Sequence, residues 1–225
     1  MITLKEWESM SGKEQTIWLE ENTELSGRYE SRRGLVQGVG INDAPYCTKP
    51  VVDGKKVVCQ AYMAWNNMLT RAYSTKYHAK HPTYSGVTVC DDWHLFMSFR
   101  EWWLGNYADG FALDKDILSD DGVYSPETCI YVPQWLNTFT IQKGEKQTNA
   151  PVGTYFDSGC RRYRADCGNP ITGKQEYIGY FKDPEMAHAA WRNRKLELAL
   201  ELKPKMDEID IRIYPRAVEI INNAK

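Results

Sequence analysis

The residues best suited to chemistry lie in one stretch, residues 113–137. It opens with an apolar residue and then places two acids around a lysine, Asp114-Lys115-Asp116. If a strand continues through this triplet, its two-residue period puts both carboxylates on one face. Carboxylates are ligands that divalent cations such as Mg²⁺ accept, and the lysine between them can clamp a phosphate. The triplet is therefore a candidate metal site. The alternative is that these acids only solvate and cap a loop.

The rest of the stretch predicts the elements that position these acids. Residues 120–122 (Asp-Asp-Gly) are a turn signal, a compact segment spans residues 124–132, and Asn137 follows. This order predicts two strands joined by a loop, with a short helix behind them.

Composition and charge limit the class of protein. A chain of 225 residues allows one or two domains, each with its own core. The formal net charge is −2, so no overall basic field indicates nucleic acid. Residues 150–203, however, carry nine Lys or Arg against seven Asp or Glu, which favours nucleic-acid contact in this half. Arg28, Arg32 and Arg33 form a smaller basic cluster, either a solvated loop or a phosphate contact.

Cysteine spacing and hydropathy indicate the compartment. No two of the six cysteines form a C-x-x-C pair, so zinc is not expected, although Cys59, Cys90 and Cys129 remain one distant combination. No signal sequence or apolar run of about 18 residues occurs. We therefore expect a cytoplasmic protein with reduced thiols and no membrane contact.

Apolar periodicity predicts the elements of the N-terminal half. Ser11 and Glu14 are spaced as a capping box, which predicts that a second helix begins there. The expected elements are helices over residues 3–25 with a break at 11–12, a hairpin over 51–58 about an Asp-Gly turn, a helix over 60–80, a strand over 86–90 and a helix capped by Asp91.

The C-terminal half predicts a separate module of three strands and one helix. The strands are expected over residues 152–156, 161–167 and 176–181, and the helix begins at Pro184 and runs to about residue 202. Residues 141–150 lack apolar periodicity and predict a linker. The expected parts are an N-terminal helical segment (1–35), a mixed domain (36–140), the linker (141–150), the module (151–203) and an amphipathic extension (204–225).

Strand alternation predicts which face of the module is functional. Arg162 and Arg164 fall on one face, and Tyr163 and Ala165 fall on the other, against the helix. Strict alternation assigns Arg161 to the inner set, unless a turn re-aims it. The alternative is that the arginines only solvate a strand face.

The module resembles the plant-type Apetala-two/ethylene-response-factor DNA-binding domain. The resemblance implies a three-stranded sheet that lies in the major groove of double-stranded DNA, with a helix behind it. The residues that carry it are Gly153-Thr154-Tyr155-Phe156, Arg162-Tyr163-Arg164-Ala165, Ile178-Gly179-Tyr180-Phe181 and Pro184-Glu185-Met186-Ala187, continuing to Ala190-Trp191. The DNA contacts that it implies are Tyr155, Arg161, Arg162, Arg164 and Tyr177.

Residues 36–139 are similar to the N-terminal part of the HNH-type endonuclease-like proteins of bacteriophages, a group that includes homing endonucleases. The residues that carry this similarity are the segments 40–44, 84–90, 113–118 and 124–129, together with Trp93. The similarity implies an α+β fold with a ββα metal element, Mg²⁺ or another divalent ion, and cleavage or nicking of double-stranded DNA. It assigns the catalytic positions to Asp114, Lys115, Asp116 and Asn137, and the metal ligands to Asp114, Asp116 and Asn137.

The sequence departs from that pattern at Lys115, which stands where the general-base histidine of the family is expected. Two flanking acids keep a lysine charged, so it is a poor proton acceptor and a good phosphate clamp. Asp116 as a weak base, a histidine from elsewhere, or a metal-bound water are the substitutes left open, and the histidines concerned are His78, His81 and His94. The alternative function is a catalytically inactive DNA- or protein-binding factor, such as a phage regulator or an inhibitor of a host system.

Overall fold

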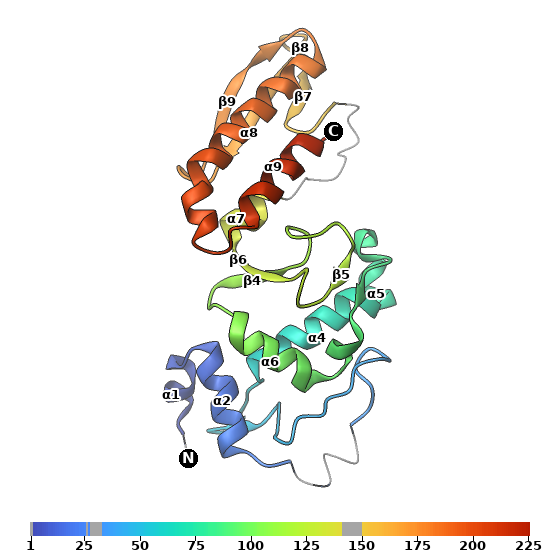
Figure 1. Cartoon of the computed structure of the whole chain (residues 1–225), viewed down its shortest axis with the longest axis vertical. Helices are drawn as coiled ribbons and strands as arrows, with labels where there is room; N and C mark the ends of the chain where they lie inside the picture. Colours follow the sequence, from blue (N-terminus) through green and yellow to red (C-terminus); the bar gives the residue numbers. More distant parts are fainter. Residues whose placement is uncertain (1, 26, 28–32, 141–149) are drawn as a thin grey trace. The chain divides into compact units, whose positions relative to one another are not determined.

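The chain is a mixed α+β protein with several small sheets (Figure 1). The computed structural model describes residues 2–25, 27, 33–140 and 150–225. The chain divides into two compact units, Met1–Tyr131 and Val132–Lys225. The predicted linker spans residues 141–150, and residues 141–149 lie outside the part of the chain that the structure describes. In the described part of the chain, no helix has the length and apolar character needed to cross a membrane.

Helices are the longest regular elements of the first unit. Ser11 caps α2 as predicted, because its hydroxyl accepts the N–H of Glu14 while the Glu14 carboxylate accepts the N–H of Ser11. Trp7 and Leu19 belong to the same buried core as Trp65, so the N-terminal segment packs within this unit. The helices are α1 (Leu4–Ser9), α2 (Gly12–Asn22), α4 (Gln60–Tyr73), α5 (Thr75–His78) and α6 (Phe96–Asn106), with 3₁₀ turns η1 (Pro82–Tyr84) and η2 (Asp91–His94).

The predicted hairpin is present, but the predicted start of a helix at Asp91 is wrong. β1 (Val51–Val52) and β2 (Lys55–Lys56) flank a turn whose central residues both have positive φ, as a type I′ turn requires. Asp91 instead begins η2, and α6 starts at Phe96. The reason is a long-range contact, since the backbone of Ile41 bonds to His94 and Phe96 and holds the intervening residue extended.

The stretch 113–137 contains the predicted order of strand, loop, strand and helix. These elements are β4 (Phe111–Asp114), β6 (Ile130–Pro133) and α7 (Gln134–Thr140), and β4 pairs with β6. The connecting loop also contains β5 (Val123–Tyr124), which pairs in parallel with β3 (Thr88–Val89). That extra pairing ties the loop to the core of the first unit.

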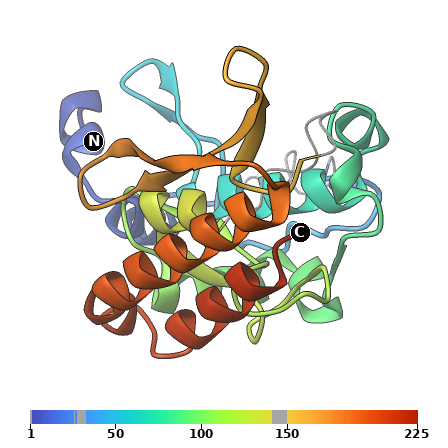
Figure 2. The same ribbon diagram turned by 90° about the horizontal axis from the view of Figure 1, so that it is seen from above.

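The second unit is a three-stranded antiparallel sheet packed on α8 (Pro184–Asp207), as predicted. Its strands lie in the order β7 (Thr154–Asp157), β8 (Arg162–Asn169) and β9 (Lys174–Phe181). Ala165 and Cys167 are fully buried on the face towards α8. α9 (Ile213–Asn223) packs beside α8, as Figure 2 shows. The helix begins where expected, with Asp183 as its cap and Pro184 in its first turn.

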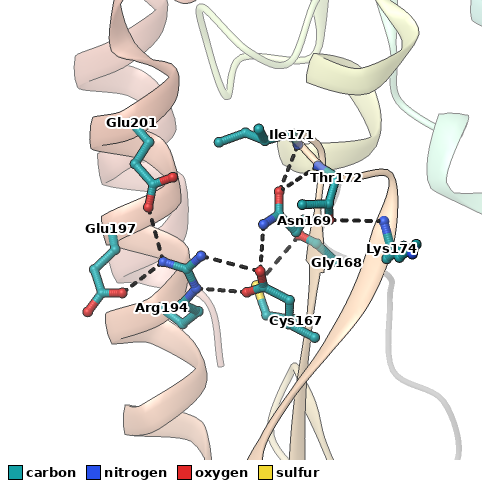
Figure 3. Close-up of polar contacts among 10 residues, drawn as sticks. Cys167, Gly168, Asn169, Ile171, Thr172, Lys174, Arg194, Glu197 and Glu201 are labelled. Carbon is teal, nitrogen blue, oxygen red and sulfur yellow. Dashed lines mark hydrogen bonds and ion pairs between the residues drawn. The ribbon is translucent and has the colours of Figure 1, made fainter.

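A polar network fixes the β8–β9 hairpin to α8. Arg194 reaches from the helix to Glu176 on β9 and also pairs with Glu197 and Glu201 on its own helix, as Figure 3 shows for the helix residues. Asn169 donates its side-chain amide to the same glutamate of β9. The hydrogen bond from Arg194 lowers the pKa of Glu176, so this carboxylate remains charged below its ordinary range.

Replacing Arg194 by methionine is expected to lower the melting temperature by about 2–4 °C at pH 7, because three neighbouring carboxylates lose their shared cation. A lowered pKa contributes stability that is lost as the pH falls through that pKa, so the difference from the wild type should shrink towards pH 3. Calorimetry at both pH values measures this, with Arg192→Met as the matched control. An equal difference at both pH values would contradict the role of the network.

Candidate nucleic-acid interface

One face of the β7–β8–β9 sheet points away from α8, and we call it the outer face. It consists of the side chains that the antiparallel register aligns on that side, namely Tyr155, Asp157, Arg162, Arg164, Asp166, Tyr177 and Tyr180. Tyr155 is 41% exposed and Tyr177 is 55% exposed, which is high for large aromatic side chains. Exposed tyrosines beside arginines form a surface on which bases and phosphates are bound.

A β-bulge in β9 creates this face. Asp166 pairs with Tyr177, whereas Ala165 pairs with Gly179, so Ile178 is an extra residue in β9. In a regular strand, residues 177 and 180 would point to opposite faces. The bulge brings both tyrosines to the outer face, where their ring centroids are 5.6 Å apart.

Arg164 is held at the centre of the outer face. Its Nε and one terminal nitrogen donate to Asp166 Oδ1 at 3.1 and 3.0 Å. The guanidinium carbon lies 5.0 Å from the ring centroid of Tyr177 and 5.8 Å from that of Tyr155. Asp166 therefore fixes one edge of the guanidinium, and Tyr180 is a further hydrogen-bond partner of Arg164 on the same face.

The other two arginines lie at the end of this face. Arg162 is exposed and opposite Asp157, whereas Arg161 sits in the β7–β8 turn with φ of 49°. The turn therefore removes Arg161 from the strict alternation. Asp157 is occupied within the hairpin, because it accepts the Tyr180 hydroxyl at 2.8 Å and the N–H groups of Gly159 and Cys160. The Tyr180 hydroxyl is the largest cause that lowers the pKa of this carboxyl.

The triplet in the first unit is built as a capped turn. Asp114 Oδ1 accepts the backbone N–H groups of Asp116 and Ile117, both at 2.8 Å. Burial raises the pKa of Asp114, and those two hydrogen bonds act against the rise. Lys115 forms an ion pair with Asp116, which is two-thirds exposed. Asp114 and Asp116 therefore face different partners.

Lys115 is buried rather than displayed. Only 6% of it is exposed, and its Nζ lies 5.7 Å from the ring centroids of both Tyr84 and Tyr124. Its ammonium group is already paired with the Asp116 carboxylate, lies near two aromatic rings and has little access to solvent. This position suits a structural cation better than a phosphate clamp.

The remaining candidate residues have other partners. Asn137 lies on α7 in the second unit, whereas Asp114 lies in the first. Nε2 of His78 bonds to the carbonyl of Arg71 at 2.8 Å, and Nε2 of His94 bonds to the hydroxyl of Tyr73 at 3.0 Å. The His81 ring packs on Tyr77 at a centroid distance of 4.4 Å.

The cysteine and arginine clusters also have structural explanations. Cys59 is buried, with its sulfur 3.7 Å from the hydroxyl of Thr16. Burial raises the pKa of Cys129 to about 12, which opposes the thiolate that zinc needs. Arg33 donates to the backbone carbonyls of residues 42, 44 and 46. Arg28 and Arg32 lie outside the described residues.

The donors of the triplet do not fit a divalent metal as they are arranged. Mg²⁺ prefers carboxylate oxygens that converge on one point. Here the Asp114 carboxylate accepts hydrogen bonds from backbone N–H groups, and the Asp116 carboxylate pairs with the buried ammonium of Lys115. In the part of the chain that is described, no three His, Cys, Asp or Glu side chains form a group that could hold a metal ion.

Two substitutions at Asp114 separate a capping role from a metal-binding role. Asp114→Ala is expected to lower the free energy of unfolding by about 1–2 kcal/mol, because two backbone donors lose their acceptor. Asp114→Asn keeps an acceptor oxygen without the charge, and burial already disfavours the charge, so it should cost less than half as much. Urea unfolding of the full chain measures both. Equal losses of stability in the two variants would show that the charge itself matters.

Sequence reasoning missed three members of the outer face, Asp157, Asp166 and Tyr180. Asp166 lies two residues after Arg164, so alternation alone places it on the same side, and that signal was present in the sequence. The position of Tyr180 on the outer face depends on the bulge in β9, and no turn residue in the sequence predicts this bulge. Comparison of the chain with protein-family models, curated proteins and solved structures finds no match.

Proposed function

We propose that the protein binds double-stranded DNA through the outer face of the β7–β8–β9 sheet. The observation that supports this best is the setting of Arg164, which is bonded to Asp166 and lies near the exposed rings of both Tyr155 and Tyr177. A guanidinium held in one orientation loses less freedom on binding than a flexible lysine does.

The geometry also supports a particular mode of binding. A two- or three-stranded sheet can enter the major groove, where an arginine fork donates to O6 and N7 of guanine. We infer that Arg161 and Arg162, at the end of the same face, contact phosphates. Asp157 accepts a hydrogen bond from Tyr180, and Asp166 accepts one from Arg164. These bonds reduce the electrostatic cost of bringing the two carboxylates near phosphates.

Titration of a fluorescent duplex with the full chain tests this proposal. Binding should weaken as salt rises, with a slope in the logarithmic plot of about −0.9 for each phosphate contacted. A hairpin-free single strand of the same length is the control ligand and should bind at least tenfold more weakly. No duplex binding at 50 mM salt, or equal binding of the single strand, would refute the proposal.

Cleavage of the bound DNA is the second candidate function. The order β4, β6, α7 and the place of Asp114 at the end of β4 favour it. The present partners of Asp114, Lys115 and Asp116 oppose it. We therefore propose that the chain binds DNA without cutting at this triplet. Incubation with supercoiled plasmid and Mg²⁺ should leave the plasmid intact, and nicking that Asp114→Asn abolishes would establish the second candidate instead.

A further inference from the structure

A recess within the second unit contains a buried cation that DNA binding does not use. The recess and the solvent at its mouth together contain about 240 Å³ of empty space. Apolar side chains make up most of its wall, and they come from α7, the segment just before β7, α8, and α9 with the residue that follows it. The wall residues include Phe139, Val152, Trp191, Ile221 and Ala224, together with Thr140 and Lys195.

Lys195 is the charged residue of this wall, among the residues that the structure describes. It is 9% exposed, and its Nζ donates to the carbonyl of Phe139 at 2.9 Å and lies 3.7 Å from the centroid of the Phe139 ring. In the described residues, no carboxylate lies within 4.0 Å of this nitrogen. A carbonyl and a ring offset only part of the cost of burying an ammonium. Burial lowers the pKa of Lys195 to about 8.

The ring of His188 also lies beside the recess and is buried. His188 Nδ1 lies 2.8 Å from the carbonyl oxygen of Val152, and its Nε2 lies 3.1 Å from that of Ala224. The same ring stacks on Trp191 at a centroid distance of 5.3 Å. Both carbonyl partners thus belong to residues of the recess wall.

We propose that this recess binds a small organic carboxylate with an aromatic or aliphatic body. The apolar wall fits the body, and Lys195 supplies the counter-charge and the N–H donors for one carboxylate group. A phosphate would present more acceptor oxygens than one ammonium can satisfy. The proposal is independent of DNA binding, because the recess lies among α7, α8 and α9 and uses no residue of the outer face.

Isothermal titration of the full chain with sodium benzoate tests this inference at pH 7. Benzoate should bind, and benzamide, which has the same shape without the charge, should bind at least tenfold more weakly. Lys195→Met keeps the length of the side chain without its charge and should weaken benzoate binding at least tenfold. The matched control is Lys203→Met, on the same helix but paired with Asp207, and it should bind as the wild type does.

A pH series on the wild-type protein keeps the test decisive if Lys195→Met does not fold. Lys195 loses its proton above about pH 8, so benzoate should bind at least tenfold more weakly at pH 10 than at pH 7. No benzoate binding at millimolar concentration, equal binding of benzamide, equal binding by folded Lys195→Met, loss of binding in Lys203→Met, or binding that is unchanged at pH 10 would each overturn the proposal.

Discussion

Replacing Arg162 and Arg164 together by alanine is expected to lower the affinity for double-stranded DNA by roughly 100-fold at physiological salt. Arg164 carries the larger part, because it is the arginine whose orientation the fold fixes, through Asp166 and two tyrosine rings. Arg162 carries a smaller and sequence-independent part through phosphate. The double variant should also flatten the salt dependence, by about 0.9 for each phosphate that the protein no longer neutralises.

Fluorescence anisotropy at four salt concentrations measures both quantities. The matched control is Lys203→Ala with Arg212→Ala, which also removes two cations from the second unit. These two residues pair with Asp207 and Asp210 and lie outside the sheet. The control should retain the affinity within about twofold, because overall charge alone contributes little at this ionic strength. An equal fall in affinity in the two double variants would mean that net charge, rather than the outer face, binds the DNA.

Gly153→Ala is expected to destabilise the protein by about 3 kcal/mol. Gly153 has φ of 80°, and a Cβ added there would lie 2.1 Å from Cδ1 of Trp191 on α8. The substitution therefore combines the strain of a left-handed backbone, about 1–2 kcal/mol, with an overlap that the buried indole cannot easily relieve. This close approach sets how tightly the start of β7 packs on α8.

The comparison with Gly173→Ala isolates the overlap. Gly173 has φ of 68°, but a Cβ there would meet no atom within 4 Å. It should cost only the backbone strain, about 1–2 kcal/mol. Urea unfolding of the two variants measures the difference. Similar destabilisation at the two sites would contradict the packing of Trp191 against the start of β7.

The sequence was informative where a local pattern decided the structure. Alternation placed Arg162 and Arg164 on one strand face and Ala165 on the other, because a strand has a fixed two-residue period. The capping box at Ser11 and the Asp-Gly turn at residue 53 needed only neighbouring residues. These features are local, so no knowledge of the tertiary structure was required.

The sequence was less informative where residues far apart in the chain decided the local structure. Asp91 does not start a helix, because Ile41 bonds to the backbone on either side of residue 95. The burial of Lys115 depends on Tyr84 and Tyr124, which approach it from η1 and β5. Tyr180 joins the outer face only because β9 contains a bulge. The triplet at residues 114–116 therefore suggested chemistry, and its tertiary contacts favour a structural role.

Photo-cross-linking to duplex DNA tests the central claim most directly. The photoreactive residue p-benzoylphenylalanine would replace Tyr177 on the outer face and, in a separate protein, Met186 on α8, which is 61% exposed. The account predicts efficient cross-linking from position 177 and only background from position 186. Equal cross-linking from both positions, or cross-linking from position 186 alone, would contradict DNA binding by the outer face.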